Sequence, residues 1–72
     1  MHIGNITKLF PHKEYGSIRI KNGEDAHFHK LCLWDIQFKE LTEGQEVEFE
    51  IQSSYNGFLA FHIRPILKSG HL

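Results

Sequence analysis

The sequence predicts an all-β fold, in which five strands of one domain form a small barrel. Apolar and polar residues alternate with a period of two in several segments, as they do in strands with one buried face. Asn-Gly pairs and prolines separate these segments, and both favour turns or strand ends. No long stretch shows the helical period, so we expect helices only as short turns.

Composition limits what the chain can be. Its 72 residues allow one domain, and 40% hydrophobic with 24% charged residues is typical of a folded soluble domain. The longest apolar runs have four residues, so we expect no membrane span, and the N-terminus shows no secretion signal. Cys32 is the one cysteine, which excludes an internal disulfide framework and a Cys-rich zinc site and favours a cytoplasmic location.

The formal net charge of −1 hides an uneven distribution. Residues 1–39 hold six basic against four acidic residues, whereas residues 40–72 hold two against five. The first half can present a modest positive face, but the field of the whole chain would attract a polyanion only weakly.

The first three strands are predicted over residues 3–10, 15–20 and 25–29. Pro11 ends the first of them, because proline cannot donate to a sheet ladder. Asn22-Gly23 lies between the second and third, where both residues tolerate the positive φ that a tight hairpin needs. These short connections predict an antiparallel meander.

Two further strands are predicted over residues 46–51 and 58–64, and a turn joins them into a hairpin. The connection over residues 30–45 is long, and we expect a short helical turn at residues 31–34 within it. A meander, a long connection and a hairpin of this size are the plan of a five-stranded antiparallel Greek-key barrel of the OB-fold class.

The outward face of the second and third strands carries the candidate functional residues. Outward side chains of neighbouring strands lie side by side, so they form one surface. Rings on such a surface stack on unpaired bases, and Lys or Arg side chains meet phosphates. With Lys13 and Lys30 at its two ends, this surface predicts binding of single-stranded nucleic acid; the alternative is a set of ordinary half-exposed strand residues. Its members are Tyr15, Ser17, Arg19, Asp25, His27 and His29.

Four segments resemble the cold-shock domain family. KEYGSI at residues 13–18 is similar to the family's first nucleic-acid-binding motif, and AHFH at residues 26–29 to its second. FKELTEGQEVEF at residues 38–49 is close to the family's Phe-x-x-Leu-x-x-Gly-Gln-x-Val-x-Phe stretch. AFHIRP at residues 60–65 resembles its Ala-x-Asn-Val-x-Pro ending.

The resemblance implies an OB-fold domain over residues 1–67 that binds single-stranded RNA or DNA, with a disordered tail over residues 68–72. Such a protein would act as a nucleic-acid chaperone or as a regulator of transcription or translation, without a cofactor. No phosphate-binding loop or catalytic triad pattern is present in the sequence, so we expect no enzymatic activity. The predicted nucleic-acid-binding residues are Lys8, Lys13, Tyr15, Ser17, Arg19, Asp25, His27, His29, Lys30, Phe38, Asn56 and Phe58.

The chain departs from the family pattern at several of these positions. Ser17 stands where the family usually has Phe, and Lys8 and Lys30 stand where many members have Trp and Phe. Glu14 replaces a glycine beside Tyr15. Fewer rings and more lysines predict weaker binding that depends more on salt.

Other interpretations stay open. His27 and His29, with His62 on the last strand, could ligate a metal, although the spacing specifies no third ligand and we expect none. The apolar segment at residues 31–36 either caps the barrel or exposes Trp34 to a partner protein. The second reading gives the rival function, a protein-interaction module on a barrel that has lost most nucleic-acid binding. The chain could be a monomer or a strand-exchanged homodimer.

Overall fold

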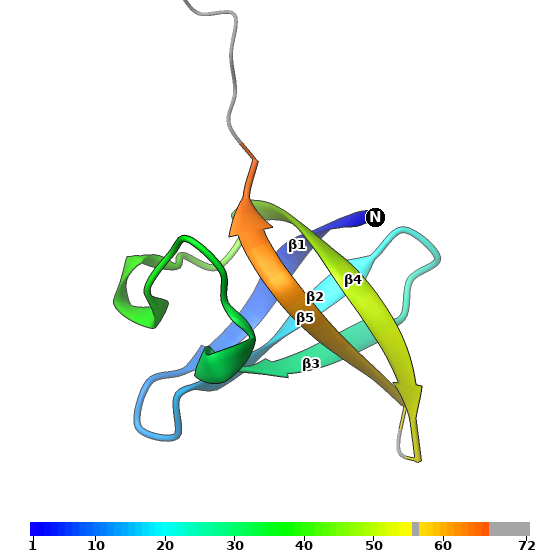
Figure 1. Ribbon diagram of the computed structural model, residues 1–72, viewed down its shortest axis with the longest axis horizontal. Coiled ribbons are helices and arrows are strands. Elements are labelled where there is room, and N and C mark those ends of the chain that lie inside the picture. Colours follow the sequence, from blue (N-terminus) through cyan, green and yellow to red (C-terminus); the bar gives the residue numbers. More distant parts are fainter. Residues whose placement is uncertain (56, 67–72) are drawn as a thin grey trace, which may run out of the picture.

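In the residues that the structure describes, 1–55 and 57–66, five strands close into a barrel in the order β1-β2-β3-β5-β4 (Figure 1). This computed structural model confirms the all-β barrel that the period of two predicts. Asn56 and the predicted tail at 68–72 lie outside the described residues. The strands are β1 (His2–Phe10), β2 (Tyr15–Ile20), β3 (Asp25–His29), β4 (Glu46–Ser54) and β5 (Gly57–Pro65).

Both predicted hairpins are present, and β4 and β5 extend further toward their shared turn than the apolar pattern indicates. That extension is exposed, so hydrophobic alternation gives no sign of it. The connection between β3 and β4 holds two short 3-10 helices, η1 (Lys30–Cys32) and η2 (Phe38–Glu40), and loops out beside the barrel in Figure 1. The described residues contain no helix long and apolar enough to cross a bilayer.

One strand pair differs from the antiparallel expectation. β3 and β5 run parallel, with Ala26 opposite Phe58 and His27 opposite Leu59. Parallel neighbours need a crossover connection. Here the chain crosses from β3 through the long connection to β4, which pairs with β1, and then returns along β5 to meet β3.

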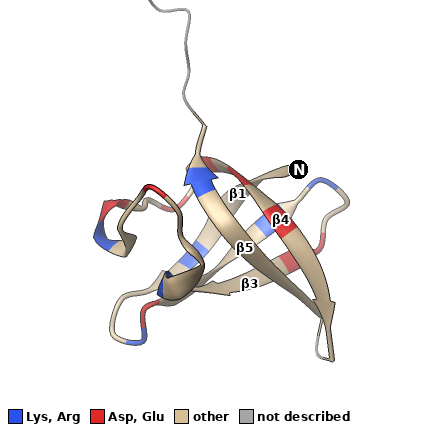
Figure 2. Ribbon diagram, viewed as in Figure 1, with Lys and Arg blue, Asp and Glu red and all other residues tan. Residues whose placement is uncertain are grey.

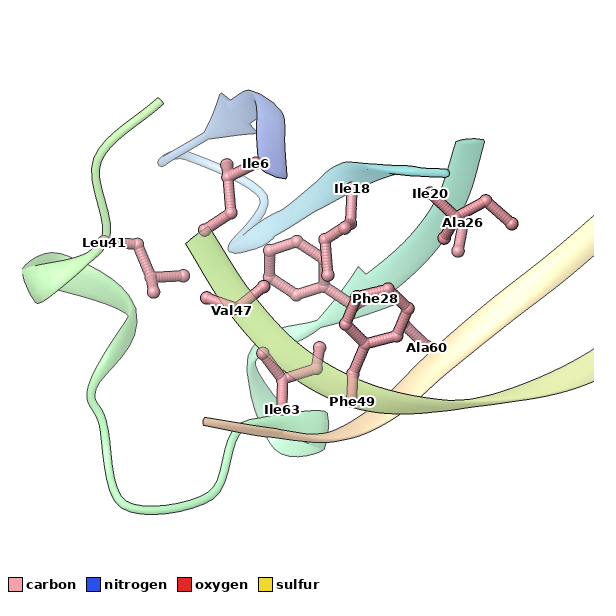
Figure 3. Close-up of a cluster of buried hydrophobic side chains, with 10 residues drawn as sticks. All are labelled: Ile6, Ile18, Ile20, Ala26, Phe28, Leu41, Val47, Phe49, Ala60 and Ile63. Carbon is pink, nitrogen blue, oxygen red and sulfur yellow. The ribbon is translucent and has the colours of Figure 1, made fainter. Parts of the chain in front are cut away.

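The barrel interior is filled by aliphatic and aromatic side chains from all five strands, with Leu41 from the connection closing one end (Figure 3). Leu33 and Ile36 pack against this core as well, which agrees with a capping role for the connection. The buried hydrophobic residues are Ile6, Ile18, Ile20, Ala26, Phe28, Leu41, Val47, Phe49, Ala60 and Ile63.

Gly16 in β2 marks a point where the chain leaves no room for a side chain. A Cβ there would lie 2.5 Å from the carbonyl oxygen of Lys8 and 2.9 Å from the Phe28 ring. The first atom belongs to the backbone of the neighbouring strand, so the strand itself would have to move.

Replacing Gly16 with alanine is therefore expected to destabilise the barrel by about 1–3 kcal/mol, the usual scale of overpacking. Urea denaturation followed by circular dichroism measures this. Ser53→Ala, at an exposed position of β4, is the control and should change the free energy of unfolding by less than about 0.5 kcal/mol. Equal midpoints for the two variants would contradict the steric argument.

Candidate nucleic-acid interface

The strand register places the predicted ring-bearing residues next to one another. Tyr15 of β2 lies opposite His29 of β3, and Ser17 lies opposite His27. Directly opposed residues on one sheet face have Cβ atoms about 5 Å apart. Tyr15, His27 and His29 also line one groove of about 440 Å³, so these three predicted residues form a single surface.

Tyr15 has an aromatic partner that the sequence reasoning missed. The Phe10 ring stacks on it, with centroids 4.8 Å apart and an angle of 23° between the planes. Phe10 is the last residue of β1 and lies opposite Tyr15 in the register. Its side chain is 40% exposed. Alternation along β1 could have placed Phe10 on the outward face. From the sequence, Phe10 is placed only as the last residue of the strand before Pro11.

His29 is held in place by the start of η1. Its Nδ1 accepts a hydrogen bond from the backbone N–H of Leu31 at 3.2 Å. A neutral imidazole that accepts at Nδ1 carries its proton at Nε2. The exposed ring therefore offers a donor at Nε2 as well as a flat face.

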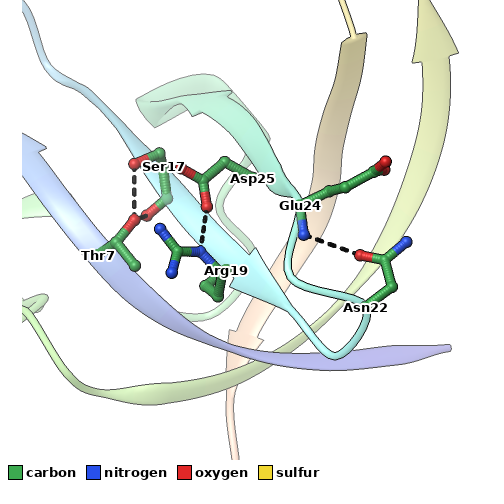
Figure 4. Close-up of polar contacts among 6 residues, drawn as sticks. All are labelled: Thr7, Ser17, Arg19, Asn22, Glu24 and Asp25. Carbon is green, nitrogen blue, oxygen red and sulfur yellow. Dashed lines mark hydrogen bonds and ion pairs between the residues drawn. The ribbon is translucent and has the colours of Figure 1, made fainter.

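Ser17 is less accessible than a binding role at its position would require. Its side chain is buried, with only 6% of the residue exposed. Its hydroxyl lies 2.8 Å from the hydroxyl of Thr7, which also donates to the Ser17 carbonyl (Figure 4). The register of β1 shifts between Ile6 and Lys8, and this bulge brings Thr7 over β2. Burial and this hydrogen bond make Ser17 a poor candidate for ligand contact.

Arg19 and Asp25 form an ion pair with each other. Arg19 Nε lies 2.6 Å from Asp25 Oδ1 across β2 and β3 (Figure 4). The hydrogen bond from Arg19, aided by its charge, lowers the pKa of the Asp25 carboxyl, and the same contacts raise the pKa of Arg19. Both groups stay charged near neutral pH, and each offsets the other. Arg19 is therefore a weaker candidate for a phosphate contact than its exposed position predicted.

Lys30 is also paired. Its Nζ lies 2.7 Å from the carboxylate of Glu14, the residue that replaces a glycine. Glu14 has a φ of 57°, the left-handed conformation that glycine adopts more readily. Within the described part of the chain, Lys8 and Lys13 have no ion pair. Figure 2 shows basic and acidic segments interleaved over the barrel.

Phe38 and Phe58 contribute more to the barrel than the prediction assumed. Both are partly buried and pack against the core. The Phe38 ring lies 6.3 Å from that of Phe28, inside the barrel. Each is partly exposed, so both remain candidates.

His62 lies in different surroundings from the other two histidines considered for a metal. Its Nδ1 is 3.5 Å from a Glu50 carboxylate oxygen, and its ring is 5.1 Å from that of Trp34. Among residues 1–55 and 57–66, no three His, Cys, Asp or Glu side chains form a metal-binding group.

Trp34 contacts β5 and stays half exposed. The Arg64 guanidinium lies 5.4 Å from its ring centroid, within range of a cation–π contact. Trp34 is 49% exposed and Leu31 is 83% exposed. The connection thus caps the core through Leu33 and Ile36 and also leaves apolar surface in solvent.

Comparison with known proteins agrees with this geometry. Residues 3–66 match the family described as 'Cold-shock' DNA-binding domain. The chain is 37% identical over 57 residues to the cold shock-like protein CspD of Bacillus cereus, covering 79% of this chain and 86% of that protein. It is 41% identical over 60 residues to the cold shock-like protein CspI of Escherichia coli, covering 81% and 86%. A cold shock-like protein of Thermotoga maritima is 41% identical over 63 residues, covering 88% and 96%. The chain belongs to the cold-shock domain family.

Proposed function

We propose that this protein binds single-stranded RNA or DNA on the outer face of β2 and β3. The observation that carries the proposal is the convergence of Tyr15, His27 and His29 on one groove. The description of the family as a DNA-binding domain supports it. Flat faces from neighbouring strands suit successive unpaired bases, because every base offers a face for stacking.

The proposed contacts divide into stacking and phosphate binding. Tyr15, His27 and His29 would stack on bases, and the Nε2 proton of His29 would donate to a base edge. Lys8 and Lys13 would meet phosphates, since their ammonium groups are not engaged by a carboxylate in the described residues. One barrel supplies all of these groups, so a monomer would suffice. The cytoplasmic location expected from the single cysteine remains part of the proposal.

The small number of rings and of unpaired cations among the described residues argues for weak, readily reversed binding. Each stacked base contributes about 1–3 kcal/mol, and few rings are available. Two of the candidate cations are already paired with carboxylates. Weak contacts that do not depend on base identity suit a nucleic-acid chaperone, which holds unpaired segments and releases them.

The rival proposal, a protein-interaction module, is supported by the exposure of Leu31 and Trp34 on the connection. It predicts that changes on β2 and β3 leave the function intact. The variants below therefore separate the two proposals.

Tyr15→Ala and His29→Ala should each weaken binding of a short oligopyrimidine by about 5- to 150-fold, the effect of losing one stacked base. Isothermal titration calorimetry gives the affinities. Tyr15→Phe keeps the ring and should bind like the original chain. His2→Ala removes an exposed imidazole on β1, away from the proposed face, and should also have little effect. Unchanged affinity in both alanine variants would remove the proposed face, and the absence of measurable binding by the unaltered chain would favour the protein-interaction module.

Salt should weaken the binding moderately. Two phosphate contacts from Lys8 and Lys13 predict a slope of about −1.4 in a plot of log affinity against log salt, or about seven-fold between about 50 and 200 mM. Lys8→Ala should reduce the slope by about 0.7. Lys21→Ala, at the exposed turn after β2, is the control and should leave it unchanged. An affinity that does not vary with salt is incompatible with these contacts.

Removing the charge of Glu14 should release Lys30 for a phosphate. In Glu14→Gln the side-chain size is kept, so the ion pair is the main loss. We expect about two- to five-fold tighter binding at low salt, the scale of one exposed ion pair, and a steeper salt slope. Glu24→Gln, an equal charge change in the β2–β3 turn, should alter neither quantity by as much. The same titrations test both variants, and equal responses would mean that only net charge matters.

A further inference from the structure

One row of strand partners crosses the whole barrel, and all of its members except the buried Ser17 are exposed. The register places Lys8 of β1 opposite Ser17, Ser17 opposite His27, His27 opposite Leu59 of β5, and Leu59 opposite Gln52 of β4. The row begins with a cation, passes an imidazole and ends with an apolar side chain and an amide. The surface that carries Tyr15 and His29 therefore does not end at β3.

The groove that Tyr15, His27 and His29 line extends onto β5. Leu59 and Phe61 of β5 and Gln52 of β4 also line it. Leu59 is 45% exposed, so it offers apolar surface to a ligand in this groove. A volume of about 440 Å³ lies within the range of small-ligand sites and has room for a base.

The described residues that line this groove carry no carboxylate that would repel a polyanion. In contrast, Glu48 and Asp35 line the hollow beside Arg64, and Glu46 lines the one beside Arg19. The groove is also continuous with the face proposed above, because the two share Tyr15, His27 and His29.

On β1 and β2, several groups of this face are already engaged within the chain. Ser17 is buried, Arg19 is paired with Asp25, and Phe10 already covers one face of the Tyr15 ring. A ring has two faces, so stacking on Tyr15 is directed to the other one. Tyr15 and His29 both line the groove, which gives the bound strand a path toward β5.

We propose that the bound single strand turns across β3 and places one nucleobase in the groove between β3 and β5. Leu59 and Phe61 contact its faces, and the Gln52 amide, which both donates and accepts, bonds to its polar edge. The site deepens the proposed function and rests on it. The stacking surface of this chain is thereby shifted from β1 and β2, where Lys8 and Ser17 replace rings, toward β5.

Titration of the isotopically labelled chain with oligothymidylate tests the site directly. The Leu59 methyl resonances should shift together with the ring resonances of Tyr15. Leu59→Ser should weaken binding at least about five-fold, the lower limit for one stacked base. Ile3→Ser, at a strand position of similar exposure (40%) on β1, is the matched control and should stay within about two-fold.

The outcomes separate this site from the proposed function. If Tyr15→Ala loses affinity while Leu59→Ser binds normally and the Leu59 methyls do not move, the groove is excluded and the proposed function stands. If the unaltered chain binds no oligonucleotide, or Tyr15→Ala has no effect, the proposed function itself falls and the groove with it. The methyl shifts are measured on the unaltered chain, so they decide the question even if Leu59→Ser unfolds.

Discussion

The barrel depends on its closure where β3 meets β5. In the described residues, two residue pairs join these strands, Ala26 with Phe58 and His27 with Leu59. Ala26 and Ala60 are fully buried there, so small side chains let the strands approach and the core stay continuous. Beyond the second pair the strands part, and the groove opens at that point. The contact that completes the core thus also shapes the outer surface.

The outer surface shows how charge and aromatic character balance in this member of the family. Lysine and serine occupy positions where rings are usual, and acidic residues neutralise part of the added positive charge. Phe10, at the end of β1, adds one ring, which stacks on Tyr15. Leu59 and Phe61 add apolar surface on β5. Rings and apolar side chains are accordingly redistributed around the barrel and are not simply lost.

Much of the fold could be predicted from the sequence because the core obeys simple alternation. Ile18 and Ile20 face inward, as do Val47 and Phe49, and the Asn-Gly pair at residues 22–23 ends β2. The site was harder to predict, because it depends on register between strands. The hairpin places Arg19 beside Asp25, but the register shift in β1 beside Thr7 and the pair that joins Lys30 to Glu14 are not specified by any spacing rule. The alignment of Leu59 with His27 needs the parallel pairing, which a meander and a hairpin do not reveal.

The place of Trp34 has a spectroscopic consequence. It is the one tryptophan of the chain, and its backbone N–H bonds to the carbonyl of Ile63 while its indole lies against Arg64 and His62. It does not line the groove that contains Tyr15 and His29. The tryptophan fluorescence of this chain therefore monitors how the long connection packs on β5. A base stacked on Tyr15 would leave this fluorescence largely unquenched.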